Sequence, residues 1–238
     1  MMKSILIPLP DIDFDTTEVA IAWQIFSRNN LKVVFSTEQG KIAATDPLLL
    51  TGVIFGQLGA KPDAIAAYNK LLKSNEFNNP ITYTAIETTT FDLLYLPGGH
   101  AKGMRPYLES KILQNKIVEF FKQGKLVGSV CHGTLLLARS IDTETNKSVV
   151  YDYKLTGLTK SLERLAYYLT KWKLDDYYRT YPEYLQDEVV TYLASPSNFK
   201  TGVNSFIPFL VEDRNLTSAR WPNDVKKLAN RLVERLKE

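Results

Sequence analysis

The chain has 238 residues, 45% of them hydrophobic, and a formal net charge of +3. This size and composition can bury a full core, so we expect one globular domain over residues 1–238. The basic residues are scattered rather than gathered into a stripe with interleaved aromatic residues, which argues against nucleic acid as a partner. No stretch approaches the roughly 20 apolar residues of a spanning helix, so we expect no membrane partner either.

The cysteine content and the N-terminal sequence bear on the cellular compartment. Cys131 is the only cysteine, so the chain cannot form an internal disulfide. The first apolar run, ILIPLP, is short, contains proline and is followed at once by acidic residues, unlike a secretory signal. We therefore expect the protein in a reducing cytoplasm.

The first elements of the chain predict a strand, a helix and a second strand in close succession. Residues 3–10 form an apolar run typical of a buried strand. Asp15 to Thr17 offer capping groups for a helix whose apolar residues recur at helical spacing as far as Phe26. Residues 31–37 predict the next strand. Short connections between these elements indicate a right-handed unit of a parallel sheet.

The middle of the chain resumes this alternation after a looser stretch. Between residues 42 and 90 the pattern weakens, and we interpret this stretch as an insertion over the sheet edge, with a helix at 62–74. Residues 91–96 then predict an apolar strand. Residues 104–124 predict one helix closed by a glycine, and residues 125–130 predict another buried strand.

The last part of the chain predicts a second insertion and a closing unit. The insertion, around 157–205, contains a helical segment at 158–174. Residues 206–221 predict a hairpin that turns at Asp213 to Asn215, and an amphipathic helix follows from Pro222. Together the elements predict a three-layer α/β/α sandwich with a mostly parallel central sheet and inserted helical segments.

Cys131 lies where a predicted strand ends and a predicted helix begins. Ligands of parallel sheets bind beyond the carboxyl ends of the strands, and a sharp turn at that point presents a nucleophile. The turn requires small neighbours, which Gly128, Ser129 and Gly133 supply. Helix N–H groups aimed at the sulfur favour a thiolate. The alternative is an inert buried cysteine that only fills space.

A second turn, at Gly98 and Gly99, follows the preceding predicted strand. Glycines let backbone N–H groups approach a reacting atom without obstruction by a Cβ. Gly99 and the backbone N–H of His132 could form an oxyanion hole, with Gly98 beside the substrate. His100 either contacts a substrate or caps the next helix or faces solvent, and we expect Arg105 to pair with Glu109 across one helical turn.

These motifs in combination resemble the ThiJ/PfpI superfamily, which includes the Parkinson-linked deglycase and is related to class I glutamine amidotransferase domains. The resemblance spans most of the chain. It rests on DFDTTEVAIAWQIFSRNNLKVVF, LYLPGGHAKGMRPYLES, GSVCHGTLLLA and EDRNLTSARWPNDVKKLA. It implies a flavodoxin-like or class I glutamine amidotransferase-like fold.

The resemblance also implies roles for individual residues. Cys131 matches the nucleophile, His132 the adjacent histidine, and Glu18 the protonated glutamate that hydrogen-bonds the cysteine sulfur. Gly99 and His132 match the positions of the oxyanion hole. Glu163 lies near the place where an acid orients the histidine in the glyoxalase and holding-chaperone branch. It could equally be an exposed helix residue paired with Lys160 or Arg164.

The expected function is a cofactor-independent thiol enzyme that acts on a small carbonyl or acyl compound, as a glyoxalase, deglycase or hydrolase. The alternatives are a redox sensor or holding chaperone that uses the same oxidisable cysteine, or a scaffold that has lost activity. No histidine follows His132, so glutamine amide transfer by the usual triad is not expected. The set of His, Cys and carboxylate residues lacks zinc-ligand spacing, and we expect neither metal nor cofactor. The resemblance suggests a homodimer.

Overall fold

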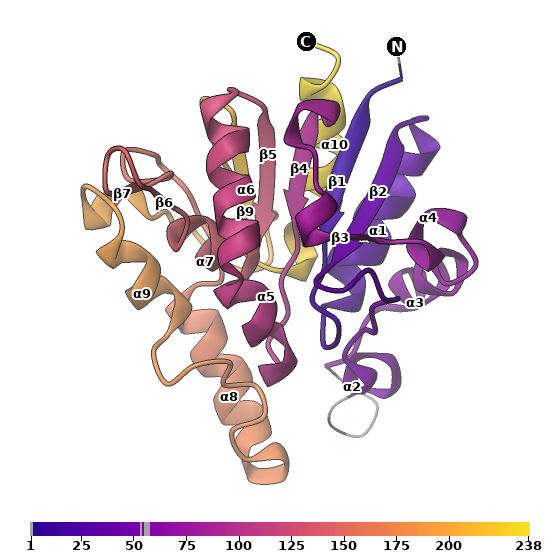
Figure 1. Cartoon of the computed structure of the whole chain (residues 1–238). Helices are drawn as coiled ribbons and strands as arrows, with labels where there is room; N and C mark the ends of the chain where they lie inside the picture. Colours follow the sequence, from indigo (N-terminus) through magenta and orange to yellow (C-terminus); the bar gives the residue numbers. More distant parts are fainter. Residues whose placement is uncertain (1, 53, 55–57) are drawn as a thin grey trace.

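A computed structural model describes residues 2–52, 54 and 58–238. It contains a seven-stranded sheet in the order β3-β2-β1-β4-β5-β9-β8, with helices on both faces (Figure 1). The strand pairs are parallel except β8 with β9, which is antiparallel. The predicted α/β/α sandwich with a mostly parallel sheet is therefore confirmed.

The strands of the main sheet are β1 (Ser4–Pro8), β2 (Lys32–Thr37), β3 (Ile81–Thr82), β4 (Leu93–Leu96), β5 (Leu126–Val130), β8 (Leu210–Asp213) and β9 (Leu216–Ala219). The central strands β1 and β4 are buried along their whole length. They are apolar rather than alternating because helices cover both faces of the sheet, which leaves neither side of these strands to water.

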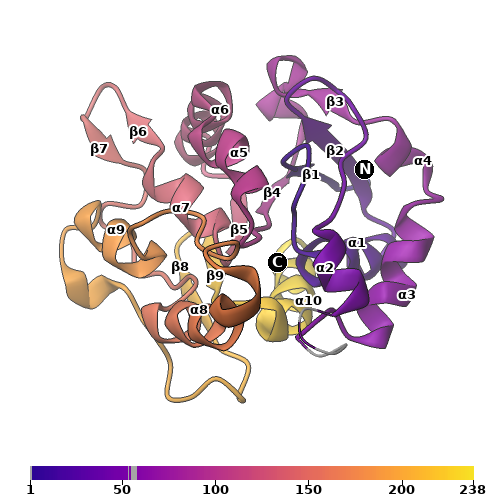
Figure 2. The same ribbon diagram turned by 90° about the horizontal axis from the view of Figure 1, so that it is seen from below.

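Helices cover the sheet in two layers, one on each face (Figure 2). One face carries α1 (Thr16–Arg28), α3 (Pro62–Leu71) and α10 (Val225–Arg235), and the other carries α5 (Arg105–Glu109), α6 (Lys111–Lys122) and α7 (Gly133–Ala138). The helix α1 begins where the sequence predicts, because the Asp15 carboxylate accepts hydrogen bonds from the N–H groups of Thr17 and Glu18.

The prediction of one helix over 104–124 is wrong. The chain breaks between α5 and α6 at Ser110, whose extended backbone ends the first helix and whose Oγ accepts a hydrogen bond from the N–H of Leu113. The expected pairing of Arg105 with Glu109 is also not found. Arg105 instead donates to the carbonyl oxygen of Thr180 at 2.7 Å.

The two predicted insertions have different places in the fold. The first contains α2 (Pro47–Thr51), α3, α4 (Asn75–Asn78) and the edge strand β3. The second contains α8 (Lys160–Leu174), which lies at the bottom of Figure 1 beyond the carboxyl ends of the strands, and α9 (Leu185–Thr191), which lies at the left of that view. Neither α9 nor the small hairpin of β6 (Ile141–Asp142) and β7 (Lys147–Ser148) was predicted from the sequence. Within the described part of the chain, every helix is too short or too polar to span a bilayer.

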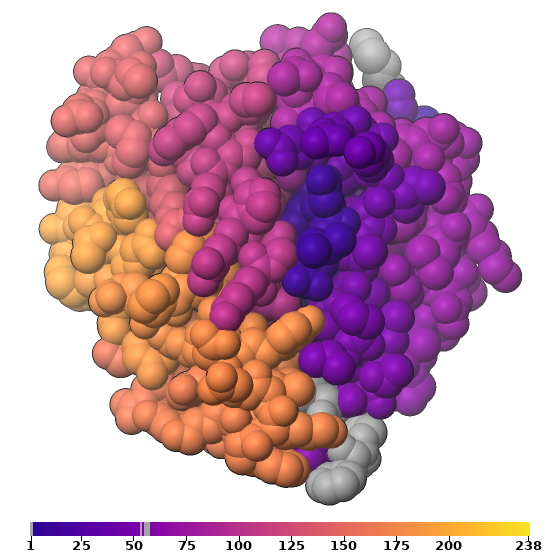
Figure 3. All heavy atoms as spheres, turned by 60° about the horizontal axis from the view of Figure 1, so that its bottom comes forward, coloured from indigo at the N-terminus to yellow at the C-terminus, as the bar shows by residue number. Residues whose placement is uncertain are grey.

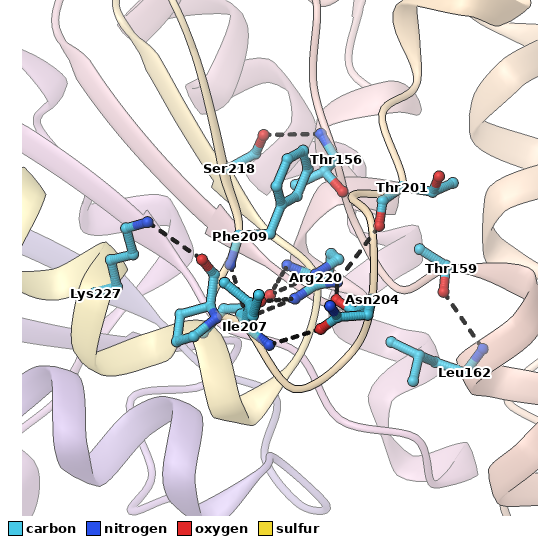
Figure 4. Close-up of polar contacts among 12 residues, drawn as sticks. Thr156, Thr159, Leu162, Thr201, Asn204, Ile207, Phe209, Ser218, Arg220 and Lys227 are labelled. Carbon is cyan, nitrogen blue, oxygen red and sulfur yellow. Dashed lines mark hydrogen bonds and ion pairs between the residues drawn. The ribbon is translucent and has the colours of Figure 1, made fainter.

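A buried ion pair fixes the segment that follows β9 (Figure 4). Arg220 is only 1% exposed, and its guanidinium binds both carboxylate oxygens of Asp224, at 2.9 and 3.0 Å. Its remaining N–H groups bind the carbonyl oxygens of Asn204 and Ile207, at 2.6 and 2.8 Å. One side chain therefore ties the loop after α9 to the start of α10.

Replacing Arg220 by methionine should strongly destabilise the fold. The substitution leaves the Asp224 carboxylate buried without its counterion, which costs about 3–5 kcal/mol in comparable proteins. Urea unfolding at neutral pH measures the loss in the free energy of unfolding.

Arg231→Met is the matched control, since Arg231 pairs with Glu212 at 2.9 Å on the surface. Water screens that pair, so its loss should change stability far less. Equal effects of the two substitutions would contradict the assigned role of Arg220.

Candidate active site

The candidate site is built where β4 and β5 end. Cys131 follows β5 directly and has a left-handed backbone conformation, with φ of 54°, which is rare for a residue with a side chain. Gly133 permits the sharp turn, because a Cβ there would lie 2.2 Å from the carbonyl oxygen of Leu96. Cys131 therefore lies on a tight turn between a strand and a helix, which is the geometry that a nucleophile elbow requires.

The Cys131 side chain is completely buried. Its relative exposure is 0%, and burial raises the pKa of its thiol well above the ordinary value. A hydrogen bond from the backbone N–H of His132 opposes this shift but is weaker than burial. Burial therefore favours a thiol rather than the thiolate that the sequence led us to expect, because desolvation outweighs the N–H groups at the turn.

Glu18 is a buried acid that lies next to the elbow. Its Oε2 accepts a hydrogen bond from the N–H of Gly98 at 2.7 Å, and its Oε1 is buried without a partner. Burial, together with the nearby Asp15 carboxylate, raises the pKa of Glu18 well above its usual range. Burial thus favours the protonated carboxyl, and Oε1 is the oxygen without a partner.

The two glycines after β4 differ in what they face. A Cβ on Gly98 would lie 2.5 Å from the backbone nitrogen of His132 and 3.0 Å from the Cβ of Cys131. A Cβ on Gly99 would instead meet the carbonyl oxygen of Asp13 at 2.5 Å. Gly98 therefore lets the two strand ends touch, and its N–H is already used by Glu18. Gly99 and His132 thus stay the predicted oxyanion donors, of which the His132 N–H contacts the sulfur of Cys131.

His132 is oriented by a threonine. Its Nδ1 lies 3.5 Å from the sulfur of Cys131, and its Nε2 lies 3.2 Å from Oγ1 of Thr180. The Thr180 hydroxyl donates its single proton to the carbonyl oxygen of His100 at 2.5 Å, so toward His132 it can only accept. Nε2 must then carry the imidazole proton. Nδ1 is left as a bare acceptor that faces the thiol.

Glu163 does not reach His132 by a hydrogen bond. It is buried, but its Oε1 binds the guanidinium of Arg179 at 3.0 Å and its Oε2 accepts the N–H of Leu185 at 3.0 Å. Burial raises its pKa to about 7. Neither role predicted for Glu163 matches this arrangement. It makes no hydrogen bond to the histidine, and it is not an exposed residue paired with Lys160 or Arg164. Its partner is Arg179, which precedes Thr180 in the chain.

His100 lies at the boundary between the site and a cavity. Its ring packs edge-on against those of His132 and Tyr178, with centroids 5.4 and 5.7 Å apart. Burial lowers its pKa to about 4, so the ring is neutral, and its Nε2 has no hydrogen-bond partner. Among the described residues, no group of three or more His, Cys, Asp and Glu side chains is arranged to hold a metal ion.

Sequence reasoning missed Thr180. It lies 48 residues after His132 in a stretch without regular periodicity, and a threonine in such a stretch carries no recognisable signal. Asp15 was recognised as a helix cap but not as a neighbour of the site. Burial raises its pKa to about 6, and its charge acts on both Glu18 and Cys131.

The fold and the elbow together define a class of α/β proteins with a cysteine at the end of a central strand. Within that class, a family model described as ThiJ/PfpI family-like matches residues 9–196. The chain therefore belongs to the ThiJ/PfpI-like family. This finding confirms the resemblance that the sequence motifs indicate.

Several curated relatives are similar over part of their length. An uncharacterized protein of Schizosaccharomyces pombe is 32% identical over 116 residues, which cover 48% of this chain and 43% of that protein. A glutathione-independent glyoxalase of the same yeast is 28% identical over 153 residues, which cover 62% of this chain and 60% of that protein. The chain thus spans about half the length of these relatives.

Solved structures show the same fold over nearly the whole chain. Glyoxalase III from Candida albicans has a TM-score of 0.72 at 16% identity, covering 98% of this chain and 97% of that one. The rapid encystment protein of Francisella tularensis has a TM-score of 0.76 at 16% identity, with 99% of both chains covered. At such low identity these likenesses establish the architecture alone.

Asp15→Asn should change how stability depends on pH. Because burial raises the pKa of Asp15 from 3.8 to about 6, the native state binds more protons than the unfolded state between these values. The stability that Asp15 contributes therefore falls as the pH rises through this window. Asparagine also caps helices but does not titrate. We compare the free energies of unfolding of the variant and the wild type, measured with urea. This difference should shift in favour of the variant by about 1–3 kcal/mol as the pH rises from about 3.5 to about 7.5.

Asp63→Asn serves as a control of opposite sign. Asp63 lies in the first turn of α3, and a hydrogen bond from Lys226 lowers its pKa. That carboxylate stabilises the fold more as the pH rises, so its asparagine variant should lose stability relative to the wild type. If both variants, or neither, gained stability relative to the wild type as the pH rises, the raised pKa of Asp15 would be refuted.

Proposed function

We propose that this protein is a cofactor-independent thiol enzyme that converts small α-oxoaldehydes into α-hydroxy acids. The observation that carries the proposal is the hydrogen-bond chain from Thr180 through His132 to Cys131, which leaves Nδ1 free to accept the thiol proton. Family membership and the glyoxalase names of two relatives, from Schizosaccharomyces pombe and Caenorhabditis elegans, support this reaction class.

In the proposed reaction, Cys131 adds to the aldehyde carbon. As the S–C bond forms, the thiol proton passes to Nδ1 of His132, and the carbonyl oxygen takes up the electron pair and then a proton to give a hemithioacetal. Removal of the C1 proton and its return at C2 moves two electrons within the substrate, which oxidises C1 and reduces the ketone at C2. Water then hydrolyses the thioester to the hydroxy acid and frees the thiol.

The neutral state of the buried groups suits this sequence of steps. Burial lowers the pKa of His132 well below 6.5, so the imidazole is an unprotonated acceptor at neutral pH. The protonated Glu18 can donate to the sulfur, and the N–H groups of Gly99 and His132 can hold the developing oxyanion. No redox partner is required, because the substrate supplies both the oxidised and the reduced carbon.

Deglycase and hydrolase activities would use the same first step. Both begin with attack of the sulfur on a carbonyl carbon, and they differ in what leaves or rearranges afterwards. A redox sensor would fit less well, because sensing cysteines are exposed and have lowered pKa values, whereas Cys131 is buried and its pKa is raised.

Cys131→Ala should abolish the conversion of methylglyoxal to lactate. Loss of a covalent nucleophile typically reduces kcat by more than about a thousandfold. Release of lactate by the purified chain, without glutathione, measures this directly.

Ser36→Ala is the matched control, since its Oγ is also buried and has no hydrogen-bond partner. This variant should keep wild-type turnover. Full activity of Cys131→Ala, or absence of lactate formation by the wild type, would remove the proposal.

Thr180→Val should reduce kcat without unfolding the protein. The valine keeps the shape of the side chain but cannot accept the Nε2 proton, so the imidazole can switch tautomer and present Nδ1–H to the sulfur. Loss of a residue that orients a functional histidine costs about 10–100-fold in comparable sites. Steady-state kinetics over pH 5–9 should show the loss in kcat rather than in KM.

Thr180→Ser is the conservative comparison, because serine keeps the hydroxyl and should restore most of the turnover. If both variants lost activity equally, packing rather than the hydrogen bond would explain the effect. Melting temperatures of the two variants show whether the fold is intact.

A further inference from the structure

A cavity of about 240 Å³ lies beside His100, whose ring packs against that of His132. Its walls come from five parts of the chain: the start of α1, the segment around α2, the turn after β4, α8 with the stretch after it, and the turn between β9 and α10. In Figure 3 the N-terminal segment, in indigo, lies recessed between magenta, orange and purple parts of the surface. The apolar wall residues include Leu49, Ala60, Ala166, Tyr178, Trp221 and Pro222.

The polar side chains of the described cavity wall come from Asp15, Thr17, His100, Thr170, Tyr178 and Asn223. Two wall residues also carry a buried nitrogen that has no hydrogen-bond partner, Nε1 of Trp221 and Nε2 of His100. An indole N–H can only donate, so it requires an acceptor such as a carbonyl or hydroxyl oxygen. The described wall residues include no lysine or arginine, and Asp15 adds negative charge as it ionises. These features disfavour an anionic ligand and suit an uncharged one.

The buried ion pair holds Trp221 in this wall. Arg220 and Asp224 flank it in the sequence, and their bidentate contact fixes the backbone on both sides of Trp221. A donor held in this way is preorganised, so a ligand need not spend binding free energy on ordering it. The unsatisfied Nε1 therefore belongs to a wall residue whose backbone is fixed.

His100 connects the cavity to the reacting groups. It lines the cavity and packs against His132, whereas neither Cys131 nor His132 is among the wall residues. A substrate whose aldehyde carbon reaches Cys131 at the His100 end would therefore place its other end in the cavity. The part of the substrate that enters the cavity must be apolar, because apolar side chains form most of its wall.

We infer that the cavity binds the side chain of an uncharged α-oxoaldehyde larger than methylglyoxal, with Nε1 of Trp221 donating a hydrogen bond to a substrate oxygen. This inference rests on the proposed function for the identity of the reactive group. The size and polarity of the side chain follow from the cavity itself. A longer side chain should bind more tightly, because each methylene group that moves from water into the cavity adds favourable transfer free energy.

The test measures binding without turnover. In the Cys131→Ala variant, calorimetric titration compares 1-hydroxyhexan-2-one with hydroxyacetone, two hydroxyketones that differ only in chain length. We expect the longer ligand to bind at least about tenfold more tightly, as is typical of a pocket that accepts extra methylenes. Equal affinity for the two ligands would overturn the inference.

Two further substitutions locate the binding site within the same background. Ala166→Leu fills the cavity and should remove the preference for the longer ligand. Trp221→Phe keeps an aromatic ring but lacks the N–H, and should weaken binding of 1-hydroxyhexan-2-one about tenfold or more. Trp172→Phe is the matched control, because Trp172 is 64% exposed and donates to the carbonyl oxygen of Leu169. If Ala166→Leu and Trp221→Phe both bound like the control, the cavity would not be the binding site.

Turnover by the wild type separates this inference from the proposed function. With 2-oxohexanal and methylglyoxal as substrates, a higher kcat/KM for 2-oxohexanal supports both proposals. Turnover of both substrates with equal kcat/KM and equal ligand affinity preserves the proposed function and rejects the cavity as a side-chain pocket. Selective binding without turnover of either substrate supports the cavity and rejects the proposed function.

Discussion

The candidate site depends on the close approach of the ends of β4 and β5. Gly98 and Gly133 permit it, because a Cβ at either position would lie 2.5 Å or less from a backbone atom of the other strand end. This contact holds Cys131 in its left-handed conformation and brings its sulfur beside the Glu18 carboxyl. A larger residue at either position would push the strand ends apart and separate Cys131 from Glu18.

The same close packing excludes water and thereby sets the protonation states. Burial raises the pKa values of Cys131 and Glu18 and lowers that of His132, so it favours the neutral form of all three groups. A neutral site avoids the large cost of burying an isolated charge. In the proposed reaction, charge would develop only as the thiol proton passes to His132.

Segments outside the central sheet supply further residues to the candidate site and to the cavity. Thr180 and Arg179 come from the stretch between α8 and α9, which lies next to the strand ends, and they position His132 and Glu163. The turn that follows β9 supplies Trp221 to the cavity wall. The shared sheet explains the structural likeness to distant family members, while these additional segments form much of the cavity wall of this chain.

The sequence by itself determined the architecture. Apolar runs, helical periodicity and glycines at strand ends are local signals, and they predicted the parallel sheet, the cap at Asp15 and a cysteine directly after a strand. The break at Ser110 is also local, because Ser110 caps α6, although the sequence prediction ran one helix through it. Only the tertiary structure decided the burial of the site and the partners of His132 and Glu163, because these features depend on contacts between segments that are far apart in the sequence.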